Sequence, residues 1–89
     1  MDITALRADI DKVDKELVKL YTKRMELAAR IGEYKKQNGI DIYDQKREQE
    51  KLKEVKQLAG DKYSAQAAEL YSLLFSQSRK LQQGINEAE

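Results

Sequence analysis

The chain has no cysteine and no histidine, and these two absences exclude several kinds of chemistry. Without cysteine there is no disulfide framework and no thiolate nucleophile. Without histidine, a Ser-His triad is excluded, as are metal sites built from His and Cys ligands. We therefore expect no metal site of this kind. The lack of cysteine also fits a reducing cytosol, so we expect a cytoplasmic protein.

Proline is also absent, and no apolar run approaches the roughly 18 residues that span a bilayer. Met1 leads into no signal-peptide pattern. Charged residues make up 37% of the chain, but 17 basic residues nearly balance 16 acidic ones. The net charge of +1 provides no field for nucleic acid or an anionic membrane, so neither is expected as a partner.

What the chain does contain is a high proportion of helix-forming residues. Ala, Glu, Lys, Leu and Arg make up about half of it, which is typical of long helices. We predict one domain, residues 1–89, divided into helices at about residues 3–36, 44–58 and 64–83. The signals that set these bounds are Asn38-Gly39, Gly60 and Gly84 as ends, and Asp44 and Ser64 as N-caps.

The first predicted helix carries an apolar seam whose positions alternate steps of three and four residues, as in a heptad repeat. These positions are Ile3, Leu6, Ile10, Val13, Leu17, Leu20, Arg24, Leu27, Ile31 and Tyr34. Such a helix would be roughly 50 Å long, whereas a compact globule of this size has a radius of gyration of about 12 Å. The seam would lie in water unless a second copy covered it. We therefore predict an all-α fold, with three-helix protomers intertwined in a homodimer.

Each predicted helix has one polar residue on its apolar stripe. Arg24 interrupts the first, Glu48 the second and Ser78 the third. Lys35 lies on the same side of its helix as Arg24, and Gln82 lies one turn after Ser78. Buried charges cost several kcal/mol unless they are paired or bind a ligand, so these residues would most simply share one cavity. A pocket rich in cations and hydrogen-bond donors suits a small dianionic ligand.

Each of these residues also has a structural explanation when it is taken alone. Arg24 could set the register of a coiled coil, Glu48 could favour a helix N-terminus, and Ser78 could be tolerated in a core. Lys35 and Gln82 could be solvated flanks. The alternative function is thus a non-enzymatic coiled-coil dimerisation module, which explains the heptad but not three coincident interruptions.

The same positions belong to a longer pattern. Residues 6–24 read LRxxIDxxDxxLxxLxxxR, a lysine follows at residue 35, and D-x-x-R-E follows at residues 44–48. In this full set, from Leu6 to about Gln82, the chain resembles the all-helical class of chorismate mutases. The resemblance implies the rearrangement of chorismate to prephenate, in phenylalanine and tyrosine biosynthesis, without a cofactor.

The resemblance also implies which residues form the site. Arg24 would bind a substrate carboxylate, and Arg7 would reach across the dimer into the site of the other protomer. Lys35 would contact a carboxylate and the ether oxygen, to which Gln82 would also donate. Glu48 would hold the substrate hydroxyl. The residues expected to be catalytic are Arg24, Lys35 and Gln82, and the substrate-binding set also includes Arg7, Asp44, Arg47, Glu48 and Ser78.

Two features depart from the family's pattern. The turn before the second helix reads Ile40-Asp41 where the family often has proline, which concerns the rigidity of the loop rather than the chemistry. Lys51 and Arg79 fall near positions that tend to be apolar around the pocket. The sequence leaves open whether these two residues border the pocket or face solvent, and whether the chain acts alone or belongs to a fusion with another enzyme.

Overall fold

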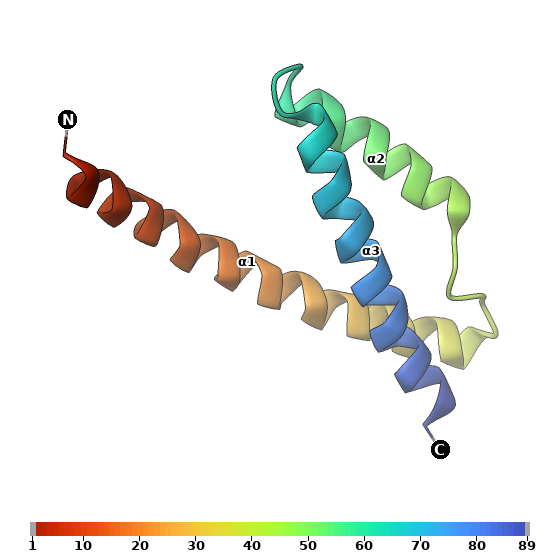
Figure 1. The fold of residues 1–89 in the computed structure, drawn as a ribbon. Coiled ribbons are helices and arrows are strands. Elements are labelled where there is room, and N and C mark those ends of the chain that lie inside the picture. Colours follow the sequence, from red (N-terminus) through yellow and green to blue (C-terminus); the bar gives the residue numbers. More distant parts are fainter. Residues whose placement is uncertain (1, 89) are drawn as a thin grey trace.

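The computed structural model describes residues 2–88, so the two end residues of the predicted domain, 1 and 89, lie outside the described residues. The helices are α1 (Ile3–Asn38), α2 (Gln45–Ala59) and α3 (Ser64–Glu87). Both α1 and α2 pack on α3, which crosses the C-terminal half of α1 (Figure 1). The predicted all-α, three-helix fold with a long first helix is confirmed. Among the described residues, no helix has an apolar stretch long enough to cross a bilayer.

Local signals set the ends of α1 and the start of α2. The Asp2 side chain caps α1 by accepting a hydrogen bond from the Thr4 backbone N–H at 3.0 Å. Gly39 ends α1 with φ of 63°, a left-handed conformation that glycine adopts without steric cost. Asp44 accepts from the Arg47 backbone N–H at 3.0 Å, which confirms it as the N-cap of α2.

The start of α3 differs from the prediction. Ser64 is its first helical residue rather than its N-cap, a position that Tyr63 holds instead. The Tyr63 carbonyl accepts from the Ala67 N–H at 2.9 Å, while the Tyr63 N–H donates to the Gly60 carbonyl at 3.2 Å. The turn after α2 therefore runs directly into α3. The helix begins at residue 64, one residue earlier than it would with Ser64 as the N-cap.

The end of α3 also differs, because the helix continues through Gly84 to Glu87. The Lys36 ammonium of α1 donates to the Ile85 carbonyl at 3.0 Å and also to the Ala88 carbonyl. The Ile85 carbonyl also accepts from the Ala88 N–H at 3.2 Å, so Lys36 adds a donor from another helix to the end of α3. This tertiary contact offsets the cost of about 0.5–1 kcal/mol that glycine carries inside a helix.

Gly84→Ala should therefore stabilise the folded protein by about 0.5–1 kcal/mol, because alanine has the higher helix propensity and lowers the entropy of the unfolded chain. Apart from its chain neighbours and the backbone of its own helix, no atom of the described residues lies within 4 Å of a Cβ built on Gly84. Urea unfolding followed by circular dichroism measures the change. Gly39→Ala is the matched control and should destabilise, since its φ of 63° is strained for alanine. A loss of stability in Gly84→Ala would contradict a continuous helix at this residue.

Small residues on α1 allow α3 to approach it closely. Ala28 and Gly32 lie one turn apart on α1, and both are buried. A Cβ built on Gly32 would lie 2.9 Å from the Gln82 Cγ, which is too close for a real contact. Gln82 is only 6% exposed in consequence, and its Nε2 donates to the Ala28 carbonyl at 2.9 Å. Glycine at position 32 thus brings the Gln82 amide against α1.

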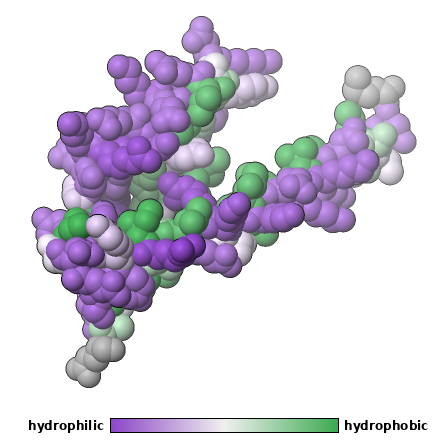
Figure 2. Space-filling view, turned by 180° about the vertical axis from the view of Figure 1, so that it is seen from behind, coloured by the Kyte–Doolittle hydropathy of each residue, from purple (hydrophilic) through white to green (hydrophobic). Residues whose placement is uncertain are grey.

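The N-terminal half of α1 projects beyond the body that the other two helices form (Figure 1). The radius of gyration is 16.3 Å, against about 12 Å for a compact chain of this length. Figure 2 shows apolar groups along this arm, where Val13 is 63% exposed. Among residues 2–88, the buried apolar side chains are Ala28, Val55 and Phe75. A single protomer therefore leaves its heptad seam uncovered.

Candidate active site

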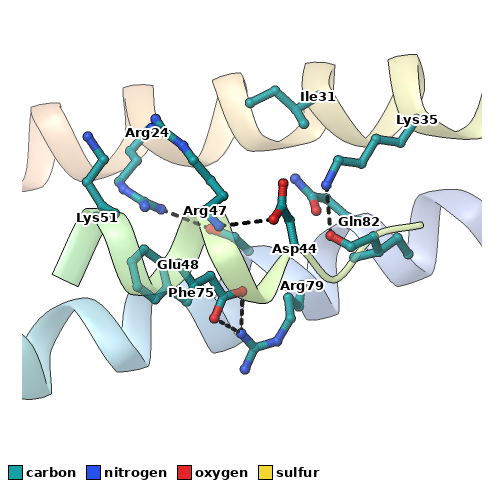
Figure 3. Close-up of a pocket in the computed structure, with 12 residues that line it drawn as sticks. Arg24, Ile31, Lys35, Asp44, Arg47, Glu48, Lys51, Phe75, Arg79 and Gln82 are labelled. Carbon is teal, nitrogen blue, oxygen red and sulfur yellow. Dashed lines mark hydrogen bonds and ion pairs between the residues drawn. The ribbon is translucent and has the colours of Figure 1, made fainter. Parts of the chain in front are cut away.

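A half-open polar cavity of about 190 Å³ lies between α1, α3 and the start of α2 (Figure 3). All three helices and the connection between α1 and α2 contribute side chains to it. The lining residues are Arg24, Ile31, Lys35, Ile42, Asp44, Arg47, Glu48, Lys51, Phe75, Ser78, Arg79 and Gln82. The structure therefore brings together every site residue predicted from the sequence except Arg7.

Arg24 is oriented by three side chains of α3. Its Nη1 donates to the Ser78 Oγ at 2.9 Å. Its guanidinium carbon lies 5.7 Å from the ring centroid of Tyr71 and equally far from that of Phe75, within the range of cation–π attraction. These contacts hold a planar, permanently charged donor at the cavity, where it suits a carboxylate. The sequence did not predict the ring contacts, although Tyr71 lies two turns before Ser78 on the same stripe.

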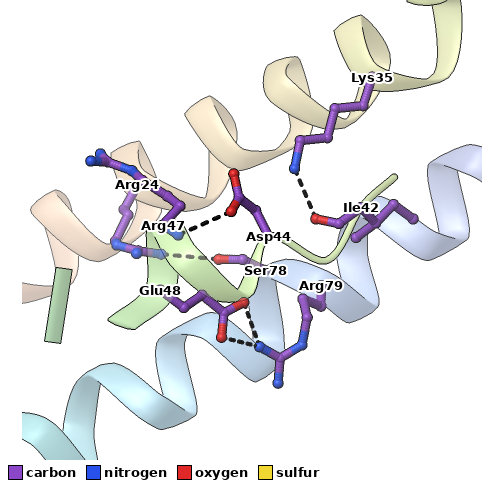
Figure 4. Close-up of polar contacts among 8 residues, drawn as sticks. All are labelled: Arg24, Lys35, Ile42, Asp44, Arg47, Glu48, Ser78 and Arg79. Carbon is purple, nitrogen blue, oxygen red and sulfur yellow. Dashed lines mark hydrogen bonds and ion pairs between the residues drawn. The ribbon is translucent and has the colours of Figure 1, made fainter. Parts of the chain in front are cut away.

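Lys35 joins α1 to the connection that leads into α2. Its Nζ donates to the Ile42 carbonyl at 2.8 Å (Figure 4). An ammonium group has three donor hydrogens, so this bond leaves donors for a ligand in the cavity. Lys35 can therefore hold the wall of the pocket and contact a ligand at the same time.

Gln82 presents a neutral amide at the same cavity. One of its two N–H donors is used by the bond to the Ala28 carbonyl, and the second can serve a ligand. Because the side chain is buried against Gly32, its amide has little freedom to turn away. This geometry suits a donor that must stay in one place at any pH.

Glu48 is paired with Arg79, which reaches it from α3. The Arg79 Nη1 donates to both carboxylate oxygens of Glu48 at 2.5 Å (Figure 4). The Arg79 guanidinium also lies over the Tyr43 ring, 5.2 Å from its centroid. The charge on the stripe of α2 is thus matched by a cation before any ligand binds.

The structure answers the question that the sequence left open about Lys51 and Arg79, because both border the cavity. Lys51 forms an ion pair with Glu54 of the same helix at 3.0 Å. A signal was present in the spacing: Lys51 lies three residues after Glu48, and Arg79 three residues before Gln82. Residues three apart on a helix share one side, so both pairs face the same way.

Cations outnumber carboxylates around the cavity. The two carboxylates are already engaged, because Asp44 caps α2 and Glu48 binds Arg79. The cationic lining residues are Arg24, Lys35, Arg47, Lys51 and Arg79. The structure thus shows the cation-rich pocket that the sequence predicted, while a small anion as its ligand stays a prediction.

Arg7 lies apart from the cavity. It is exposed on the projecting part of α1, 17 residues before Arg24, which corresponds to about 25 Å along the helix. A side chain cannot reach across that distance to the cavity of its own chain. The expected role of Arg7 in the site of a second protomer stays a prediction.

Comparison with known families supports the fold and the pattern of residues. Residues 6–83 match the family described as chorismate mutase type II. The chain belongs to this family. Type II is the all-helical class, so the resemblance predicted from the sequence is confirmed, and the family is one of isomerase-type enzymes.

The chain also resembles parts of three longer curated proteins. It is 46% identical to a T-protein of Haemophilus influenzae over 43 residues, which is 48% of this chain and 11% of that protein. It is 51% identical to a T-protein of Enterobacter agglomerans over 47 residues, which is 53% of this chain and 13% of that protein. A bifunctional chorismate mutase/prephenate dehydratase of Aquifex aeolicus is 34% identical over 62 residues, which is 70% of this chain and 17% of that protein. The chain thus spans 11–17% of these relatives. No solved structure gives a significant match.

Proposed function

We propose that this chain is a chorismate mutase that rearranges chorismate to prephenate, a step toward phenylalanine and tyrosine. The observation that carries the proposal is the meeting of Arg24, Lys35, Glu48 and Gln82 at one cavity in a chain of this family. These residues come from three different helices, so a general preference for surface charge does not explain why they meet.

The reaction is unimolecular, since the ether C–O bond breaks as the new C–C bond forms within one molecule. It needs no nucleophile, which fits a chain without cysteine or histidine. Catalysis must come from holding the chair-like conformer and from stabilising negative charge on the ether oxygen. Even an acceleration of about 10⁶-fold requires these contacts to lower the activation free energy by roughly 8 kcal/mol.

The cavity offers groups for both tasks. Arg24, held by Ser78, would bind one carboxylate of chorismate. Lys35 and Gln82 would donate to the ether oxygen with the hydrogens that their bonds to Ile42 and Ala28 leave free. Asp44 and Arg47 would complete the binding set from the first turn of α2.

A direct assay tests the proposed function. Mixed with this protein, chorismate should lose its absorbance at a rate proportional to protein concentration, with prephenate as the product. Arg24→Ala, checked for unchanged helical circular dichroism, is the control that separates this activity from a contaminant. A folded protein that leaves chorismate unchanged would favour the alternative of a coiled-coil module.

We also propose that the active form is an intertwined homodimer in which each Arg7 serves the site of the other protomer. Support comes from the seam of α1, where Ile10, Val13 and Leu17 are all more than half exposed in one protomer. An apolar surface of this length favours association. Sedimentation should therefore find a dimer, and a folded, active monomer would contradict the proposal.

Two inactive variants should restore activity to each other if Arg7 acts across the dimer. Arg7→Ala and Arg24→Ala each disable both sites of their own homodimers. After subunit exchange, a heterodimer has one site with both changes and one intact site, so an equal mixture should regain about a quarter of wild-type activity. The same mixture assayed before exchange is the control. No recovery after complete exchange would contradict a site in which Arg7 comes from the other protomer.

We propose a cytoplasmic location as well, supported by the absence of cysteine. The near balance of 17 basic and 16 acidic residues argues against nucleic acid or an anionic membrane as a partner. The proposed small-molecule partner is chorismate alone.

A further inference from the structure

Arg79 forms an ion pair with Glu48 at the cavity, and the proposed mechanism gives Arg79 no task. Its side chain is 36% exposed and that of Glu48 is 21% exposed, so the pair is partly shielded from water. One nitrogen, Nη1, contacts both oxygens of the carboxylate at 2.5 Å. Charge-assisted contacts of this kind are among the stronger hydrogen bonds in proteins.

Glu48 presents an electrostatic problem if the ligand is a dianion. A carboxylate at the wall of the cavity repels the two carboxylates of chorismate, and low exposure strengthens the repulsion. Yet a carboxylate is a good acceptor for a ligand hydroxyl. The site therefore needs a hydrogen-bond acceptor that does not repel the carboxylates of the substrate. A fixed cation beside Glu48 meets this need, because it offsets the negative charge of Glu48.

We infer that Arg79 is a positioning residue that neutralises and orients Glu48, so that the enzyme selects chorismate by its ring hydroxyl. The inference rests on the proposed function and adds a residue to it. Arg79 acts through Glu48 rather than by touching the substrate.

The contact leaves Glu48 able to accept from the substrate. An ionised carboxylate has about four lone-pair sites on its two oxygens. Arg79 occupies the sites that face it, one on each oxygen, and leaves the others for the hydroxyl. Because both oxygens are held, the plane of the carboxylate is fixed before the ligand arrives.

Tyr43 also contacts Arg79 and helps to hold it in this position. The ring belongs to the connection between α1 and α2, and the guanidinium lies over it at 5.2 Å from the centroid. In Figure 4 the Arg79 guanidinium lies on the side of Glu48 away from Arg24 and Lys35. Arg79 is therefore engaged by Glu48 and Tyr43 and not aimed with the other cations at the ligand carboxylates.

The test compares two substrates, chorismate and an analogue that lacks the ring hydroxyl. Arg79→Met keeps most of the length of the side chain and removes the donors and the charge. Lys80→Met is the matched control, because it removes the same charge from the next residue of α3, which is exposed and does not line the cavity. For each protein, kcat and KM are measured with both substrates, and circular dichroism confirms the fold.

With chorismate, Arg79→Met should lower kcat/KM about tenfold or more, the loss expected when a charge-assisted contact to a binding group is removed. With the analogue, the loss should be clearly smaller, because the analogue still meets the uncompensated charge of Glu48 but has no hydroxyl to be held. Glu48→Ala, which removes the acceptor, should also lower turnover of chorismate more than turnover of the analogue, and adding Arg79→Met to it should cause little further loss of this selectivity. Equal losses with both substrates, or no loss with either, would overturn the inference.

A second variant keeps the inference testable if Arg79→Met fails to fold. Tyr43 is 56% exposed, so Tyr43→Leu should leave the fold intact while removing the ring beneath Arg79. It should weaken turnover of chorismate more than turnover of the analogue, and equal effects would count against the role of Arg79. A wild-type protein that does not turn over chorismate would instead refute the proposed function itself.

Discussion

Lys35→Ala should lower kcat/KM for chorismate more than 100-fold, which corresponds to at least about 3 kcal/mol in the barrier. The loss is large because the Lys35 ammonium would stabilise charge that develops on the ether oxygen only as the bond breaks. A donor of this kind contributes more in the transition state than in the ground state, so kcat should fall with kcat/KM. Steady-state kinetics on the purified variant measure both constants.

The matched control for Lys35→Ala is Lys36→Ala. Both lysines lie at the end of α1, and each donates to a backbone carbonyl, Lys35 to that of Ile42 and Lys36 to that of Ile85. Lys36→Ala should lower thermal stability by loosening the end of α3 and should leave kcat nearly unchanged. If the two variants show the same small loss of activity, Lys35 only supports the loop and does not serve the reaction.

Gln82→Glu should be nearly inactive at neutral pH and should recover activity as the pH falls. A carboxyl group donates a hydrogen bond only while it is protonated, whereas the amide of Gln82 donates at any pH. When ionised, the new carboxylate would repel the negative charge on the ether oxygen and would also face the Ala28 carbonyl that Gln82 now contacts. The wild-type protein should show no such activation toward low pH.

The matched control here is Gln83→Glu, which introduces the same charge one residue later, at an exposed position of α3. Its pH profile should parallel that of the wild type. Both variants are measured as kcat/KM against pH, over the range in which circular dichroism shows them folded. A Gln82→Glu profile that also parallels the wild type would place Gln82 outside the reacting centre.

The sequence alone was sufficient for the number of helices, for the approximate bounds of α1 and α2, and for most of the polar residues that meet at the cavity. Helix periodicity is a local property, and an N-cap such as Asp44 or a left-handed Gly39 acts within one or two turns of its own position. The polar residues Arg24 and Glu48 were informative because each breaks an otherwise apolar stripe. Their cost in a buried position implies a common cavity, and the structure brings them to one.

The tertiary structure decided what the periodicity could not. The pairing of Arg79 with Glu48 joins residues 31 positions apart, so it depends on how α2 lies against α3 and not on any local pattern. The length of α3 was set in the same way: glycine at position 84 is locally unfavourable, and the contact from Lys36 of another helix outweighs it. Local propensity is worth tenths of a kcal/mol to about 1 kcal/mol per residue, and a single tertiary hydrogen bond is comparable. Where the two conflict, the packing of the helices settles the outcome.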